Sequence, residues 1–213
     1  MDRAAGARTV SVTGRARLAL AASILCASAA ALADEPVRGG ADPRVTILVF
    51  SAFACPYCAE ANAQLDTLRA RYGDRLEVVF KHYPLGMDRA GYLPHEAALA
   101  AAEQDKFWPM HDRLFAHQPS LTPEVVARLA REIGLDEARF AASLASRRFR
   151  AQVDRDIAEA RALNVRAAPT FFVDGIKLEG LQSLDTMEQI VSFRAKDPGG
   201  PGPLRPAAAS PPR

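Results

Sequence analysis

Two cysteines separated by two residues are the strongest chemical signal in the sequence. Cys55 and Cys58 enclose Pro56 and Tyr57, and a helical pattern begins at Pro56. Side chains three positions apart on a helix lie about one turn from each other, so the two sulfurs can share a disulfide bond. The spacing predicts a dithiol that exchanges with other disulfides, with Cys55–Cys58 as the redox-active pair.

The position of the pair at the start of a helix predicts a different role for each sulfur. Cys55 follows a short apolar run, residues 45–50, that is typical of a buried strand. The unpaired N–H groups and the positive end of the helix dipole favour thiolate over thiol at this position. We therefore expect Cys55 to be the nucleophile. Cys58 should face further into the protein and act as the resolving thiol, which attacks a mixed disulfide.

Two other uses of a cysteine pair fit less well. A disulfide that closes a four-residue loop restrains little of the unfolded chain, so a purely structural bridge would contribute little stability. A zinc site needs about four ligands. The sequence offers a single C-x-x-C pair and four scattered histidines, His82, His95, His111 and His117. We predict neither a metal nor an organic cofactor.

Residues 1–33 have the order of a secretory signal peptide. Four arginines, Arg3, Arg8, Arg15 and Arg17, precede an uncharged, Ala-rich run over residues 18–33 that ends in an A-x-A pattern. We expect cleavage after Ala33 and export to the periplasm. The uncharged run is short for a membrane anchor, because a spanning helix needs about 20 apolar residues. Leu25, directly before Cys26, is too large for a lipoprotein signal.

Removal of this segment would leave a nearly neutral chain. Four positive charges and one negative charge leave with it, which changes the formal charge from +2 to −1. A charge so close to zero does not predict nucleic-acid binding. The remaining chain of about 180 residues is long enough to fold around its own core without disulfide bridges.

Patterning along the chain predicts an α/β domain interrupted by helices. After a flexible lead-in over residues 34–43, the expected β-α-β unit has a strand at 45–50, a helix from Pro56 to Gly73 and a strand at 76–83. Five helical pieces follow without a convincing strand, at 93–104, 106–117, 122–133, 136–145 and 147–163. A hairpin at 170–173 and 176–178 turns at Asp174-Gly175, and a last helix runs from Ser183 or Asp185 to about Ala195.

This order defines the expected domain organisation. Residues 44–91 and 164–196 should form two parts of one domain, and residues 92–163 should form a helical domain inserted between them. Residues 197–213 hold six prolines and three glycines, so we predict that this tail is disordered.

A proline stands at the start of the predicted hairpin. Pro169 precedes the strand at 170–173, a position where a strand tolerates proline. A cis bond to Pro169 would turn the backbone of Ala168 toward the dithiol, where it could pair with an extended substrate segment. Composition alone favours the trans form for any single proline.

Four motifs together resemble the DsbA-like branch of thioredoxin-fold proteins. In family order they are FSAFACPYC, FKHYPL, FWPMHDRLF and APTFFVDG, and the resemblance covers about residues 42–195. It implies a thioredoxin fold with a helical insertion, a nucleophilic Cys55, a resolving Cys58 and a cis-proline at Pro169 that faces them. Ala168, Pro169, Pro56 and Tyr57 would form the substrate-binding surface.

The sequence departs from the family at two positions. Ala52 stands where many relatives have an acidic residue, and Ala168 stands where Val or Thr is more usual. Both positions adjoin the dithiol, so redox potential and substrate preference are open. The Pro56-Tyr57 pair also occurs in glutaredoxins. However, the whole predicted helical segment lies between Cys58 and Pro169, and glutaredoxins cross that gap without an inserted domain.

Together, the leader-like pattern and the motifs predict an exported, monomeric enzyme that oxidises dithiols of client proteins. The resemblance implies that a membrane quinone-linked partner of the DsbB kind reoxidises it. The alternative is a disulfide reductase or isomerase of the same fold, and a redox-inert binding module is a third reading. Five further residues that invite roles, Lys81, His82, His95, Trp108 and His111, are interpreted as structural or exposed. The sequence does not place a histidine near Cys55.

Overall fold

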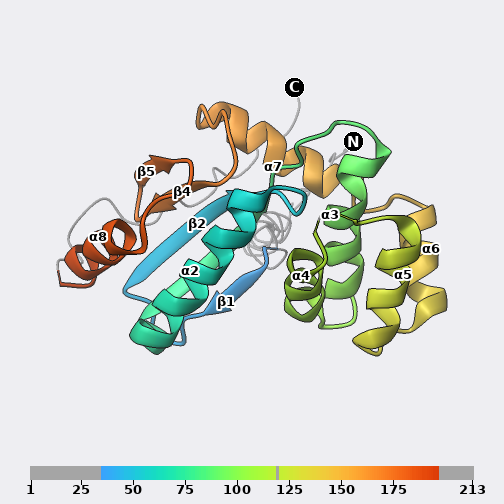
Figure 1. Ribbon diagram of the computed structural model, residues 1–213, viewed down its shortest axis with the longest axis horizontal. Helices are drawn as coiled ribbons and strands as arrows, with labels where there is room; N and C mark the ends of the chain where they lie inside the picture. The colour runs from blue at the N-terminus through green and yellow to red at the C-terminus, as the bar shows by residue number, and fades with distance from the viewer. Residues whose placement is uncertain (1–34, 119, 197–213) are drawn as a thin grey trace, which may run out of the picture. The chain divides into compact units, whose positions relative to one another are not determined.

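A five-stranded mixed sheet forms the centre of the protein. The computed structural model describes residues 35–118 and 120–196 (Figure 1), so the predicted signal peptide and the predicted disordered tail lie outside the described residues. The strands are β1 (Val37–Gly39), β2 (Val45–Ser51), β3 (Leu76–His82), β4 (Thr170–Val173) and β5 (Ile176–Glu179). Their order across the sheet is β1-β3-β2-β4-β5.

The pairing of the strands follows from the connections between them. Helix α2 (Pro56–Tyr72) and the short 3-10 helix η1 (Gly73–Arg75) carry the chain from β2 to β3, which are parallel. Such a crossover requires parallel strands, so the predicted β-α-β unit is confirmed. The β4–β5 pair is an antiparallel hairpin, as predicted. Its turn residues Asp174 and Gly175 have φ of 43° and 88°, the positive values that a two-residue hairpin turn requires.

Helices cover both faces of the sheet. On one face, α2 and α8 (Leu184–Lys196) pack against alternate residues of β2, such as Ile47 and Val49. On the other face, α7 (Arg150–Ala162) packs against Leu48 and Phe50, the residues between them. Successive side chains of a strand point to opposite faces, and β2 is apolar on both because both faces are covered.

The remaining helices lie together beside the sheet (Figure 1). They are α3 (Arg89–Ala102), α4 (Phe107–Ala116), α5 (Pro123–Glu132) and α6 (Glu137–Ala145). Three of them begin at a side-chain cap: Asp88, Thr122 and Asp136 accept hydrogen bonds from the backbone N–H groups of Gly91, Val125 and Arg139. The cap at Asp88 starts α3 four residues earlier than the apolar pattern predicts.

One part of the sequence-based prediction is wrong. Three residues of the expected flexible lead-in over 34–43 form β1, which pairs antiparallel with β3. The strand is stabilised by contacts with a distant helix, because Trp108 Nε1 donates to the Val37 carbonyl at 2.9 Å and Arg38 pairs with Asp112. Local composition carries no sign of such long-range contacts.

Candidate active site

The two thiols lie at the start of α2, where the chain leaves the carboxyl end of β2. Cys55 is the N-cap residue, with an extended backbone, and Pro56 occupies the first turn. The Cys55 carbonyl accepts the N–H groups of Cys58 at 3.0 Å and Ala59 at 3.2 Å, which closes the first turn. Both thiols are free and nearly buried, with 4% of Cys55 and 1% of Cys58 exposed. Since Pro56 has no N–H, Tyr57 holds the remaining backbone N–H of this turn, which points toward the Cys55 end of the helix.

The loop before β4 brings Ala168 and Pro169 to the thiols. The Ala168–Pro169 peptide bond is cis, and the Cys55 thiol donates to the Ala168 carbonyl across 3.6 Å. The contact joins residues 113 positions apart. It exists because β4 pairs with β2, with Thr170 opposite Phe50, so the segment before β4 meets the segment after β2.

The environment of Cys58 favours its neutral thiol. Burial raises the pKa of Cys58 to about 12. The Ala52 N–H, which donates to Cys58 Sγ at 3.5 Å, and the Ser51 hydroxyl lower that pKa in part, whereas the neighbouring Cys55 raises it further. Cys58 therefore needs help to lose its proton before it can attack a disulfide.

A glutamine from the helical segment holds the cysteine loop. The Gln118 amide, just beyond the end of α4, donates to the Cys55 carbonyl at 3.1 Å and also to the Phe53 carbonyl. Sequence reasoning missed this residue, since nothing in the local pattern links a glutamine to a distant loop. The contact satisfies carbonyls at the turn that carries Cys55, so it holds that turn in place.

Comparison with protein families identifies the chain. The family model described as thioredoxin matches residues 32–192. The chain belongs to the thioredoxin family. This agrees with the fold and with the placement of the two cysteines at the start of the first helix after β2.

Solved structures show the same fold as this thioredoxin-family chain. A thioredoxin-like oxidoreductase from Silicibacter pomeroyi DSS-3 has a TM-score of 0.70 at 26% identity, over 76% of this chain and 93% of that one. BdbD from Bacillus subtilis has a TM-score of 0.70 at 22% identity, over 78% and 95%. The thiol-disulfide exchange protein alpha-DsbA2 from Wolbachia pipientis has 0.67 at 18% identity, over 81% and 97%. The predicted DsbA-like thioredoxin fold is confirmed.

Curated relatives match this thioredoxin-family chain over part of their length. A Na(+)/H(+) antiporter NhaA from Herminiimonas arsenicoxydans is 39% identical over 157 residues, which are 74% of this chain and 25% of that protein. NhaA 3 from Salinispora tropica is 35% identical over 175 residues, 79% of this chain and 27% of that protein. The chain thus spans about a quarter of the length of these relatives. Within residues 35–118 and 120–196, no helix is long and apolar enough to cross a membrane.

An apolar cavity begins at the cysteine loop. Its volume is about 1000 Å³, and Ala54, directly before Cys55, forms part of its wall. Most of the wall comes from α3, α5 and α6, including Leu93, Pro94, Phe140, Ala141 and Leu144. Large apolar side chains are also exposed nearby in the chain: Tyr57 follows Cys55 by two residues, and Leu85 and Met87 lie in the loop after β3. These surfaces can receive apolar side chains of a bound polypeptide.

A buried lysine of β3 is surrounded by carboxylates in this thioredoxin-family fold. Lys81 contacts Glu35 at 2.5 Å, Glu159 at 2.8 Å and Asp156 at 3.5 Å. Burial lowers the pKa of Lys81, but these carboxylates outweigh it and raise that pKa above its usual value. Burial raises the pKa of Asp156 to about 7. Lys81 is therefore a structural cation with its charge balanced inside the protein.

Two histidines pack against each other at the end of β3. The Nδ1 atoms of His82 and His95 lie 2.9 Å apart, and burial lowers the pKa of both rings, that of His95 to about 3. Both are therefore neutral at pH 7 and supply no positive charge to a thiolate. Among the described residues, no group of three His, Cys, Asp or Glu side chains is arranged to hold a metal ion.

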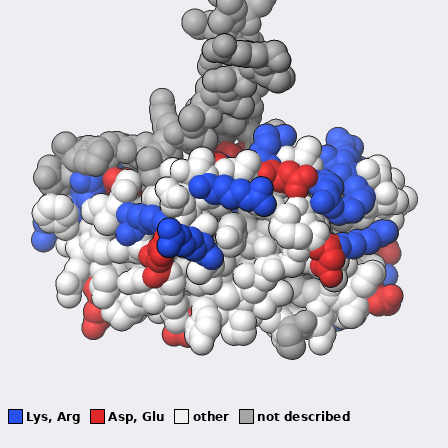
Figure 2. Space-filling model, turned by 90° about the horizontal axis from the view of Figure 1, so that it is seen from above, with Lys and Arg blue, Asp and Glu red and all other residues white. Residues whose placement is uncertain are grey.

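The surface carries charges of both signs. On the face drawn in Figure 2, Lys and Arg side chains lie among Asp and Glu side chains, and wide areas carry neither. Several charged side chains of the described residues are paired, for example Arg150 with Asp154 and Arg148 with Glu103. The described part of this face therefore presents no uniform field of one sign.

Proposed function

We propose that the protein is an exported thiol–disulfide oxidoreductase that oxidises pairs of thiols in client proteins. The observation that carries this proposal is the Cys55–Cys58 pair at the start of α2, with the Ala168 carbonyl 3.6 Å from the Cys55 sulfur. A nucleophilic sulfur at a helix start, a second sulfur one turn away and a backbone carbonyl beside them are the parts that disulfide exchange needs.

The reaction proceeds in two exchanges. A client thiolate attacks Cys55 Sγ of the oxidised pair, a client–Cys55 disulfide forms, and Cys58 leaves as a thiolate. A second client thiolate then attacks the client sulfur of the mixed disulfide, and Cys55 leaves. The client gains a disulfide and loses two electrons, which remain on the Cys55–Cys58 dithiol. A membrane quinone-linked partner of the DsbB kind would take these electrons and restore the disulfide.

The geometry also supports a polypeptide substrate. The backbone of Ala168 beside Cys55 offers hydrogen bonds to an extended client segment, with Pro169, Pro56 and Tyr57 around it. The apolar cavity that begins at Ala54, next to Cys55 in the chain, would take client side chains. Export to the periplasm and a monomeric state complete the proposal, supported by the leader-like pattern of residues 1–33 and by the DsbA-like motifs.

The reduction potential of the pair tests the direction of the reaction. The purified protein is equilibrated with glutathione buffers, and the fraction of dithiol is measured by mass after acid quenching and alkylation. An oxidase should have a potential above about −200 mV, whereas a value near −270 mV, as in thioredoxin, would favour the alternative reductase. A pair that does not exchange with glutathione, and does not oxidise a reduced client, would contradict the proposed function.

A charge placed in the apolar cavity should weaken binding of clients without changing the chemistry at sulfur. Ala141 lines the cavity. For Ala141→Asp we expect about a tenfold higher KM for a reduced client protein, because a carboxylate must be desolvated against apolar side chains. The rate with dithiothreitol, which is too small to need the cavity, should not change. Steady-state oxidation assays measure both.

The neighbouring Ala142 provides the matched control. It lies on the same helix, is exposed and does not line the cavity. Ala142→Asp should therefore behave as wild type with both substrates. Equal KM values for the client in the two variants would show that the cavity does not bind it.

A further inference from the structure

A small internal cavity adjoins the resolving thiol. Its volume is about 10 Å³, at the lower limit for one water molecule. Four polar residues line it: Ser51 from β2, Cys58 and Asn62 from α2, and His111 from α4. Trp108 and apolar side chains form the rest of the wall, and none of its described lining residues is Asp or Glu. Among the side chains that line this cavity together with Cys58, the His111 imidazole is therefore the strongest base.

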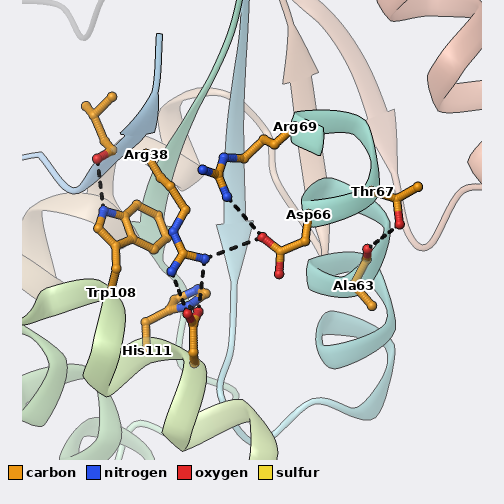
Figure 3. Close-up of polar contacts among 9 residues, drawn as sticks. Arg38, Ala63, Asp66, Thr67, Arg69, Trp108 and His111 are labelled. Atoms are coloured by element: carbon orange, nitrogen blue, oxygen red, sulfur yellow. Dashed lines mark hydrogen bonds and ion pairs between the residues drawn. The ribbon is translucent and has the colours of Figure 1, made fainter. Parts of the chain in front are cut away.

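A chain of polar contacts holds His111 in place (Figure 3). His111 Nδ1 lies 2.8 Å from a carboxylate oxygen of Asp112. Asp112 is paired with both Nη atoms of Arg38, and the Arg38 guanidinium lies 4.6 Å from the centre of the Trp108 ring. Arg38 also reaches Asp66 on α2. The contacts join β1, α2 and α4 around the histidine.

This arrangement determines which ring nitrogen of His111 carries hydrogen. Burial raises the pKa of Asp112, but His111 and Arg38 outweigh it and hold that pKa below its usual value, so Asp112 is a carboxylate and can only accept. Nδ1 of His111 must therefore be the donor, which leaves the lone pair on Nε2. Burial lowers the pKa of His111, against the opposing effect of Asp112, so the ring is neutral at pH 7 and its Nε2 lone pair is unprotonated.

We propose that His111 exchanges a proton with Cys58 through a water molecule in the shared cavity, and that Asp112 positions the ring for this transfer. The proposal rests on the proposed disulfide exchange and names the group that serves its resolving thiol. When Cys58 resolves a mixed disulfide, its S–H proton passes to the water, and a proton of the water passes to His111 Nε2. The Cys58 thiolate attacks Cys55 Sγ, the Cys55–Cys58 bond forms, and the client leaves as a thiolate. During client oxidation the steps run in reverse: Cys58 leaves as a thiolate, His111 Nε2 takes up a proton from solvent, and that proton passes through the water to Cys58.

Transfer inside the cavity avoids an isolated buried charge. A lone thiolate at Cys58 would be desolvated without a partner. Proton transfer to His111 creates a thiolate and an imidazolium together, and each favours the charged form of the other. Asp112 then stabilises the imidazolium through its hydrogen bond to Nδ1, the ring nitrogen that does not receive the proton. The titratable and charged groups that face this pair are Asp112 on α4, Arg38 on β1, Asp66 on α2, His82 on β3 and Cys55.

Single-turnover kinetics with a chromophoric aromatic disulfide isolate the step. In the reduced protein, Cys55 releases the first aromatic thiol in a phase that depends on reagent concentration. Cys58 releases the second in a phase that does not, because its attack is intramolecular. For wild type, the second phase should be nearly flat above pH 7, since neutral His111 is already available. For His111→Gln it should be about 100-fold slower at pH 7 and rise about tenfold per pH unit, because only hydroxide then removes the proton.

Three further variants make the test decisive. His95→Gln removes another buried histidine that does not line the cavity, and its second phase should match wild type. In His111→Ala, added imidazole should restore the second phase in proportion to its concentration. Asp112→Asn, at a partly exposed position, should slow the second phase several-fold and leave the first unchanged.

The outcomes separate this proposal from the proposed function. A second phase in His111→Gln with wild-type rate and pH dependence overturns the role of His111, even if clients are still oxidised. If His111→Gln does not fold, an unchanged second phase in Asp112→Asn overturns it instead. Loss of the first phase in wild type would contradict disulfide exchange at Cys55 itself.

Discussion

The Cys58→Ser variant is expected to accumulate mixed disulfides with its clients, which wild type releases. Cys55 would keep its place at the start of α2 and its contact with the Ala168 carbonyl, so it can still attack a disulfide. Serine has no sulfur with which to displace the client, and the adduct persists. Non-reducing gels of cell extracts should show a ladder of adducts that disappears with reductant, and turnover should fall by at least about 100-fold.

Cys55→Ser is the matched control for this experiment. It removes the attacking sulfur one turn away on the same helix, and it should form no adducts and have no activity. A Cys58→Ser variant that turns over clients at the wild-type rate would show that the two-thiol mechanism is wrong. Adducts in Cys55→Ser would instead assign the attack to Cys58.

The two thiols should differ strongly in their reaction with an alkylating agent. Because burial raises the pKa of Cys58 to about 12, only about one Cys58 in 10⁵ is a thiolate at pH 7. Cys55 is the N-cap residue, so no turn of α2 covers it from the N-terminal side. Its exposed fraction is 4%, compared with 1% for Cys58. Brief treatment of the reduced protein with iodoacetamide at pH 7 should label Cys55 at least about 100-fold faster. Peptide mapping measures the ratio.

The pH dependence of the labelling rate tests whether the pKa of Cys58 is raised. A raised pKa means that Cys58 gains thiolate only at high pH, so its labelling in Cys55→Ser should rise about tenfold per unit from pH 8 to 10. Both cysteines should react at similar rates in the urea-unfolded protein, which excludes an intrinsic difference. Predominant labelling of Cys58 in the folded protein would reverse the assigned roles.

Sequence patterns within a few neighbouring residues predicted strand β2, several helix starts and the hairpin turn correctly. The apolar run before Cys55 and the proline after it placed the strand and the start of α2, because each depends on local side-chain patterning and helix-start chemistry. Thr122 and Asp136 placed two helix starts within one residue. The pair Asp174-Gly175 placed the hairpin, since few residues adopt positive φ at such a turn.

Features that depend on distant contacts could not be predicted in this way. Arg38 and Val37 look like part of a polar lead-in, yet they form a strand through pairing with β3 and contacts with α4. His111 was interpreted as structural or exposed, yet it shares a cavity wall with Cys58, because α2 and α4 meet in the core. Gln118 is similar: its partners are backbone carbonyls, which every residue has. No composition rule singles out such contacts.

The pairing of β2 with β4 has a consequence for the newly made chain. Cys55 and the Ala168 carbonyl that faces it are separated by 113 positions, so the sulfurs leave the ribosome well before the segment that completes their pocket. During that interval the core that buries Cys58 does not yet exist, and both sulfurs are as open to oxidants as those of any unfolded polypeptide. The newly made protein is thus, for a time, chemically equivalent to the reduced clients proposed for it. A cell that makes it must protect these two sulfurs until the last strand arrives.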